Sequence, residues 1–356
     1  MKSIRVVSLL LLCIPNLFGL QSPTATSQKP AKKTSAATNK PVHVQSSDLA
    51  AAQHLLDNGQ LDEALKATEA LSRQQPEPPD VEFLRGKSFY LKADFQNADS
   101  AFQKAIAQDS TNREAVQLRG ATLFRMGKPA EAIPLLEQSH GNMPRLNLDG
   151  TYVLALCYLN THRFDESRRS FAALYHIQPD AAPAYLLLGT MLLRWKNPSA
   201  AQEMAQKAIA LNPRLAEAHY LVGQVALAGG RVDEALAEFE HETAINPLFG
   251  PVYDRLGDVY LQKNQYEKAQ DALNQAILLE PDATGPYILL GQVLLKRENS
   301  STAIVYLKRA TEMDPSNELS HYLLGQAYRN LGRTEEAKVE FQTVAKLKGQ
   351  STRPHR

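Results

Sequence analysis

The sequence of 356 residues is poor in cysteine and tryptophan, with two Cys and one Trp. One Cys lies in the first twenty residues and the other is Cys157, so removal of an N-terminal segment would leave no internal disulfide. A metal-type His/Cys spacing, a nucleophile elbow, a dinucleotide fingerprint and a phosphate-binding loop are also missing. These absences argue against an enzyme and predict that the protein has neither a cofactor nor a bound metal.

Negative charge is absent from residues 1–40, which hold six Lys or Arg and no Asp or Glu. Of 39 basic and 38 acidic residues in the whole chain, 33 basic and 38 acidic ones therefore belong to residues 41–356. Nucleic acid binding needs a concentrated basic face, because the phosphates must be neutralised. The mildly acidic main body thus predicts no nucleic acid partner.

The N-terminal residues differ from the rest of the chain. A short basic start is followed by an apolar run of about fifteen residues, which is typical of a secretory signal peptide and predicts one over 1–22. Residues 23–44 are rich in Ser, Thr, Pro, Ala and Lys, and they predict a flexible basic linker that weakly contacts an anionic envelope surface. We expect a periplasmic or secreted protein, or alternatively one anchored in the membrane by an uncleaved N-terminal segment.

A period of 34 residues dominates the remaining chain. The residue types of Gly223, Ala235 and Pro247 recur 34 residues further along the chain, as the Gly of this set does at Gly257. Such a period is typical of stacked repeats that bury their apolar faces against one another. Each unit predicts an apolar helix followed by an Ala-rich amphipathic helix that ends near a Pro. We count nine units over 45–349, followed by a short basic tail at 350–356. The units begin at 45, 79, 113, 148, 182, 216, 250, 284 and 318.

These repeats resemble the tetratricopeptide repeat, which has a small residue, Ala and Pro at positions 8, 20 and 32 of its 34 residues. The unit that begins at Gly250 carries the hallmark side chains Tyr253, Leu256, Gly257, Tyr260, Ala269, Ala276 and Pro281. The resemblance implies an all-α fold, a right-handed superhelical α-solenoid of helix-turn-helix repeats. Two departures stand out: Pro134 falls inside a predicted second helix, where we expect a kink, and Ser110 replaces a terminal Pro.

In this family the first helix of each unit lines a concave groove, mainly through positions 2, 5, 9 and 12. The resemblance therefore implies a groove with an apolar, tyrosine-bearing floor and a row of amides. At positions 5 and 9 the candidate groove residues are Tyr152, Leu186, Tyr220, Gln224, Asp254, Asp258, Ile288, Gln292, Tyr322 and Gln326. Gln side chains can pair with a ligand backbone, Tyr supplies area with a polar tip, and the two Asp can receive a basic side chain.

The sequence thus predicts an exported scaffold or adaptor that binds a peptide or helix of a partner protein carrying apolar anchors and Lys or Arg. The alternative is an accessory protein of cell-envelope assembly or secretion that binds glycan or peptidoglycan. The last unit has no following amphipathic helix to cover its outer face, so weak self-association through this uncapped repeat is a further hypothesis.

Overall fold

The computed structural model describes residues 44–74, 77–139 and 150–351. Over these ranges the chain folds into eighteen helices and no strand, which confirms the predicted all-α class. The predicted signal peptide lies outside the described residues, as do nearly all of the predicted linker and the last five residues of the tail. Among the described helices, none combines the length and the apolar character that crossing a membrane requires.

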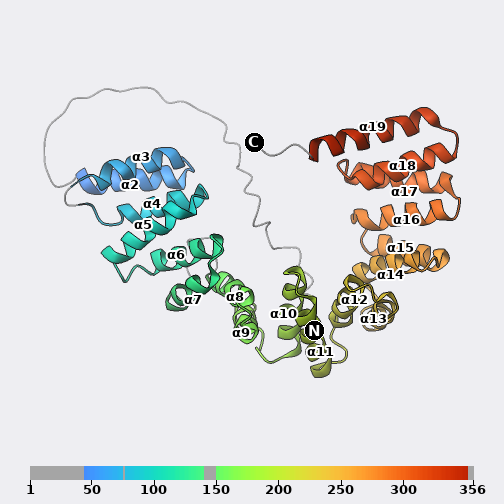
Figure 1. Cartoon of the computed structure of the whole chain (residues 1–356), viewed down its shortest axis with the longest axis horizontal. Helices are drawn as coiled ribbons and strands as arrows, with labels where there is room; N and C mark the ends of the chain where they lie inside the picture. The colour runs from blue at the N-terminus through green and yellow to red at the C-terminus, as the bar shows by residue number, and fades with distance from the viewer. Residues whose placement is uncertain (1–43, 75–76, 140–149, 352–356) are drawn as a thin grey trace. The chain divides into compact units, whose positions relative to one another are not determined.

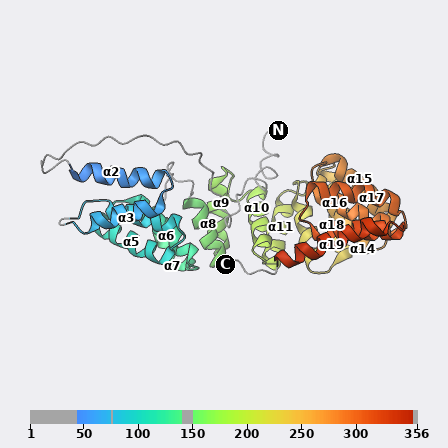
Figure 2. The ribbon, with the colours of Figure 1, turned by 90° about the horizontal axis from the view of Figure 1, so that it is seen from above.

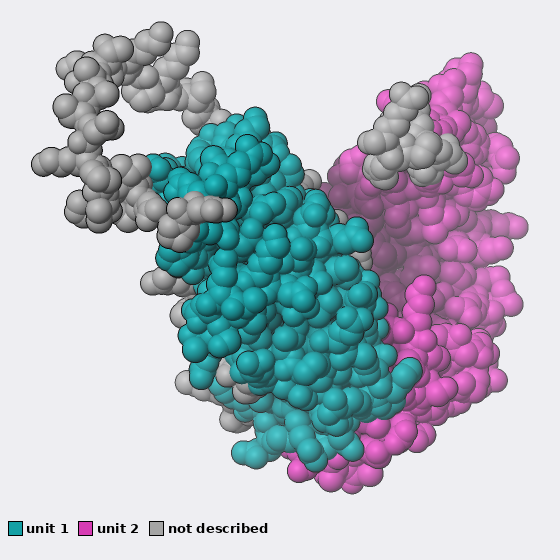
Figure 3. Space-filling model, turned by 60° about the vertical axis from the view of Figure 1, so that its left-hand side comes forward, with its two compact units in different colours: residues 1–179 teal, residues 180–356 magenta. Residues whose placement is uncertain are grey.

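The helices belong to two compact units, residues 1–179 and 180–356, which Figure 3 colours separately. In the described part of the first unit the helices are α2 Val44–Asp57, α3 Leu61–Ser72, α4 Val81–Leu91, α5 Phe95–Gln108, α6 Arg113–Arg125, α7 Pro129–Gln138, α8 Gly150–Asn160 and α9 Phe164–Leu174. In the second unit they are α10 Ala182–Arg194, α11 Pro198–Leu211, α12 Ala218–Ala228, α13 Val232–Ile245, α14 Gly250–Gln262, α15 Tyr266–Leu279, α16 Thr284–Lys296, α17 Ser300–Met313, α18 Glu318–Asn330 and α19 Thr334–Ser351.

Within each unit every helix packs against the next one along the chain, so the helices form successive helix-turn-helix pairs. Figures 1 and 2 show this stacking for α14 to α19. The first helices of neighbouring pairs also touch, as α14 does with α16 and α16 with α18. The observed starts of α10, α14, α16 and α18 coincide with the starts expected from the 34-residue period.

The small residue at position 8 lies where the two helices of a pair cross. A Cβ atom built on Gly257 would come within 2.4 Å of the Leu273 Cγ, and one on Gly291 within 2.4 Å of the Leu307 Cγ. Such distances are far inside van der Waals contact, so the neighbouring side chain would have to move. Glycine at this position thus allows a large side chain of the second helix to fill the crossing point.

The second helices α11, α13, α15 and α17 end two residues before the Pro of their repeat. The residue between, for example Asn212 before Pro213, has an extended backbone with φ −147° and ψ 94°. This is the conformation that a following Pro imposes, because its ring excludes the helical region for the preceding residue. In the first unit Asp109 adopts φ −137° and ψ 96° without a Pro, and its carboxylate accepts hydrogen bonds from the N–H and the hydroxyl of Thr111. The same side-chain turn occurs where the Pro is present, since Asn212 and Asp314 also accept a hydrogen bond from the N–H two residues further on.

The turn inside each helix pair contains one residue in the left-handed region, always at position 15 of the repeat. Four of these residues are Gly, such as Gly230 with φ 72°, whereas others such as Asn264 and Glu298 have φ 56° and 59°. Glycine adopts this conformation without a steric penalty, while a residue with a Cβ is strained there. The turns of the nine described helix pairs thus share one backbone conformation although their residue types differ.

A continuous apolar core runs through the second unit from α12 to α19, with Phe239, Leu273, Leu307 and Leu324 almost fully buried. The first unit has several smaller apolar clusters, and one of them surrounds Phe102. Helix α7 continues through Pro134, but at ten residues it is the shortest helix of the described chain. The kink expected at Pro134 stays a prediction, and residues 140–149 lie outside the described ranges.

Candidate functional site

The candidate groove residues are distributed over both units. Tyr152 lies on α8 of the first unit, where its ring packs edge-on against Phe171 with centroids 5.9 Å apart. The other nine lie on the first helices α10, α12, α14, α16 and α18 of the second unit. These nine residues belong to one packed unit.

Two of the predicted contact residues are not at the surface. Leu186 is 2% exposed and Ile288 is 7% exposed, and Ile288 belongs to the core of the second unit. The reason is that an apolar side chain at position 5 is stabilised by turning into the contact between adjacent repeats, whereas a polar one stays at the edge. Neither side chain therefore offers open surface in this structure, and contact of these two residues with a ligand stays a prediction.

Tyr220 is mostly enclosed as well. Its ring packs against Phe239 at 5.8 Å and edge-on against Phe249 at 5.1 Å. Burial raises the pKa of the Tyr220 hydroxyl to about 12, so the group stays neutral. Tyr220 therefore acts mainly as a packing residue between α12, α13 and the start of α14.

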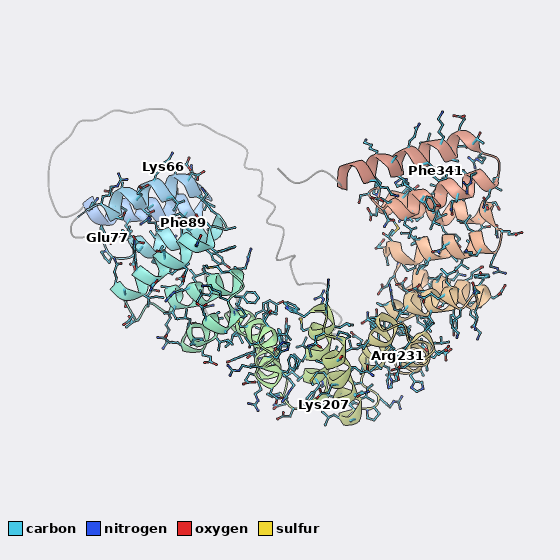
Figure 4. The ribbon with its side chains drawn as sticks, viewed as in Figure 1. Lys66, Glu77, Phe89, Lys207, Arg231 and Phe341 are labelled. Carbon is cyan, nitrogen blue, oxygen red and sulfur yellow. The ribbon has the colours of Figure 1, made fainter. Side chains whose placement is uncertain are left out.

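Tyr322 differs from Tyr220 because it is 45% exposed. One face of its ring packs against Phe341 of α19 at 6.0 Å, and Figure 4 labels this Phe on the last helix. An aromatic ring that is held on one side and open on the other offers preformed apolar area to a partner. It is the one candidate aromatic group of the second unit that is open to solvent in the described structure.

The amides at position 9 are partly exposed. Gln224, Gln292 and Gln326 form no side-chain hydrogen bond with any part of the chain that the structure describes. Each amide can donate two hydrogen bonds and accept two, which is the pattern that an extended peptide backbone requires. These three groups are therefore free to bind a ligand.

The two acidic residues do not stand alone. Arg255 places one guanidinium nitrogen 2.5 Å from a carboxylate oxygen of Asp254 and another 4.0 Å from one of Asp258. Burial disfavours the charged form of Arg255, but these two carboxylates and Tyr220 outweigh burial and raise the pKa of the guanidinium. Two carboxylates four residues apart on one helix face repel each other, and the Arg255 guanidinium offsets this repulsion by cancelling one of the two negative charges.

A further carboxylate lies next to this cluster. Burial, and then the charge of Asp254, raise the pKa of Glu280, which follows α15. The Asp254 Oδ1 atom is inaccessible to solvent and lacks a hydrogen-bond partner in the described chain. A buried acceptor without a partner carries a free-energy cost, which a donor group that reached it would relieve. Neither Arg255 nor Glu280 could be assigned to this cluster from the repeat period.

We use the term first-helix surface for the exposed or partly exposed residues of this set. It comprises Gln224, Asp254, Asp258, Gln292, Tyr322 and Gln326. A separate apolar depression of about 420 Å³ is lined by Arg329 of α18 and by residues of α19 that include Ala337 and Phe341.

The side chains at position 4 of the repeat form hydrogen bonds that the repeat pattern did not predict. The hydroxyls of Tyr253 and Tyr287 donate to the carbonyl oxygens of Pro247 and Pro281 at 3.0 and 3.1 Å. Each bond joins the start of one repeat to the end of the preceding one. His219, at the same position, instead has its Nδ1 atom 2.7 Å from a carboxylate oxygen of Glu238 on α13.

Comparison with known proteins supports the repeat assignment. Models of the tetratricopeptide repeat match residues 49–113, 123–192, 186–247, 250–283 and 294–356. A comparison with curated protein sequences finds no match.

Solved structures are similar over part of the chain. MamA 41-end from Desulfovibrio magneticus RS-1 is 22% identical with a TM-score of 0.45, covering 48% of this chain and 97% of that one. YrrB, described as a TPR protein with an unusual peptide-binding site, is 21% identical with a TM-score of 0.44, covering 51% and 93%. Pseudomonas aeruginosa PilF is 20% identical with a TM-score of 0.43, covering 46% and 75%. Since the repeat models together match well over half of the residues, the chain belongs to the tetratricopeptide repeat family.

Proposed function

We propose that the protein is a scaffold of nine tetratricopeptide repeats that binds a peptide or helical segment of a partner protein at the first-helix surface. The observation that supports this most is the set of unpaired amides at position 9, combined with the open ring of Tyr322. A packed solenoid presents these groups on rigid helices, so little conformational entropy is lost when a ligand binds.

The proposed ligand carries apolar anchors and one or two Lys or Arg. An apolar side chain would pack against Tyr322, and the ligand backbone would exchange hydrogen bonds with the amides. Asp258 is the better acceptor for a basic group, because its distance of 4.0 Å from Arg255 makes a weaker ion pair than the one Asp254 forms.

A peptide array tests this proposal. Peptides with apolar anchors, with and without Lys or Arg, are applied to the wild type and to Tyr322→Ala and Asp258→Asn. Loss of an aromatic anchor is expected to weaken binding by about 2 kcal/mol. Asp258→Asn should reduce binding of the basic peptides alone, together with its salt dependence.

Leu278→Ala is the matched control. Leu278 is an apolar residue that is 74% exposed, but it lies on α15, a second helix. Its removal should leave binding unchanged. Equal losses for Tyr322→Ala and Leu278→Ala would mean that binding is not confined to the first helices. Retention of peptidoglycan fragments in place of peptides would favour the glycan-binding alternative.

We also propose that the protein is exported, with cleavage of the signal peptide and with the basic linker in contact with an anionic envelope surface. Mass spectrometry of the native protein should then find a new N-terminus between about Leu20 and Ser27. An intact Met1 in a soluble cytoplasmic fraction would contradict export.

A further inference from the structure

His219, Glu238 and His241 form a cluster at one edge of the α12–α13 pair. Their potential ligand atoms, one from each residue, all lie within 4.8 Å of one another. The two imidazole rings are 5.3 Å apart, with an angle of 68° between their planes. The spacing of these residues in the sequence does not match a known metal-binding motif, because they come from two antiparallel helices.

The backbone around the cluster is held in place. Glu238 and His241 are three residues apart on α13 and therefore share one helix face. The buried carboxylate of Glu242 accepts hydrogen bonds from the N–H groups of Glu217 and Tyr220, at 2.7 and 3.3 Å. These bonds tie the residues on both sides of His219 to the residue next to His241, so the two helices cannot slide and separate the cluster.

The last repeat shows what the His–Glu pair does by itself. There His321 Nδ1 lies 2.6 Å from a carboxylate oxygen of Glu340, at the same repeat positions as His219 and Glu238. His321 Nε2 also lies 3.2 Å from the carbonyl oxygen of Pro315. The pair is therefore a structural contact that the two repeats share, and it does not by itself indicate a ligand.

Two features distinguish the cluster on α12 and α13. The position of His241 is taken in the last repeat by Thr343, whose hydroxyl donates to the backbone of α19. In addition, the structure gives His219 no hydrogen bond to a backbone carbonyl anywhere in the described chain, so one ring nitrogen stays unpaired. The third donor and the free nitrogen are what a metal requires beyond the structural pair.

We propose that His219, Glu238 and His241 bind a zinc ion. Two imidazole nitrogens and one carboxylate oxygen form a three-ligand zinc set that leaves a fourth position for water or for a side chain of a partner. Imidazole suits Zn²⁺, Cu²⁺ and Ni²⁺ and not Mg²⁺ or Ca²⁺, which prefer oxygen. This site is separate from the first-helix surface and does not depend on the proposed peptide binding.

The geometry needs a modest adjustment. Tetrahedral Zn²⁺ places its donor atoms about 3.3 Å apart, given metal–ligand distances of about 2.0–2.1 Å. His219 and Glu238, at 2.7 Å, would separate slightly. His241 is exposed, so its side chain can rotate to shorten the longer distances without disturbing the core.

Calorimetric titration of the full chain with Zn²⁺, prepared without a histidine tag, tests the proposal. The wild type should bind Zn²⁺ at a site that His241→Thr weakens by at least about tenfold, since even the loss of a group next to a metal ligand costs that much. His241 is exposed, so this variant should keep its helical circular dichroism. Co²⁺ bound to the wild type should show the visible absorption of a tetrahedral complex, and the variant should not.

The last repeat supplies a converse variant. Thr343→His would add the missing donor beside His321 and Glu340, but His321 Nε2 still lies against the Pro315 carbonyl oxygen, so this variant should bind Zn²⁺ more weakly there than the wild-type cluster on α12 and α13 does. The proposal is refuted if the wild type binds no Zn²⁺ or if His241→Thr binds it with unchanged affinity.

Discussion

Replacement of Gly257 by Leu tests the crossing of α14 and α15, on which the packing of the second unit depends. A Cβ atom at this position would already lie 2.4 Å from Cγ and 2.5 Å from Cδ2 of Leu273, which is fully buried. The larger side chain must therefore push the helices apart. We expect a loss of about 1–3 kcal/mol in the free energy of unfolding, which is the usual cost of overpacking a core.

A double-mutant cycle identifies the cause of that loss. Leu273→Ala alone leaves a cavity and should cost about 2–5 kcal/mol. In the combination of Gly257→Leu with Leu273→Ala, the new side chain can enter the space that Leu273 vacates. The double variant should therefore lose less stability than the two single changes added together, with a coupling of about 0.5–3 kcal/mol.

Urea unfolding followed by circular dichroism measures these differences, and hydrogen exchange shows where they act. Because contacts in a solenoid are local, faster exchange should centre on α14 to α17. Gly285→Ala is the control, since its Cβ atom would meet only the Asp254 Oδ1 atom at 3.5 Å, an ordinary contact, and the change should stay within about 0.5 kcal/mol. Unchanged stability for Gly257→Leu, or strict additivity in the cycle, would refute the assigned crossing.

Three further predictions follow from particular side chains. Glu298 has a φ of 59° in an exposed turn, so Glu298→Gly should raise the midpoint of urea unfolding, by up to about 1 kcal/mol of stability, and a lowered midpoint would contradict the strain. Burial raises the pKa of the Cys157 thiol to about 12, so iodoacetamide at pH 8 should label Cys157 only after denaturation, as peptide mass spectrometry would detect. Val339 is 59% exposed on α19. If this face self-associates, light scattering at high concentration should show dimers of the wild type and only monomers of Val339→Lys. A wild type that stays monomeric would exclude the contact.

The 34-residue period was sufficient to predict the fold. It placed Gly257 at a helix crossing and Pro247 just after a second helix, because backbone sterics act at these positions whatever surrounds them. The period gave less information about the binding site. Position 5 holds the buried Ile288 in one repeat and the open Tyr322 in the next, since the neighbouring side chains decide which way each residue packs.

Contacts between helices were the least predictable part. The ion pair of Arg255 with Asp254 depends on rotamers that a repeat pattern does not specify. The cluster of His219, Glu238 and His241 needs the antiparallel alignment of two helices before its residues meet. The only sequence signal for it was a His at a position where neighbouring repeats have Tyr, followed later by a Glu-x-x-His segment on a predicted helix.

Hydrogen exchange with and without a bound peptide tests the central claim most directly. The peptide would be one selected from an array for binding that Tyr322→Ala weakens. We predict slower exchange on the first helices α14, α16 and α18, with the second helices α15 and α17 unchanged. Protection confined to α15 and α17, or to the first unit, would contradict the assignment of partner binding to the first-helix surface.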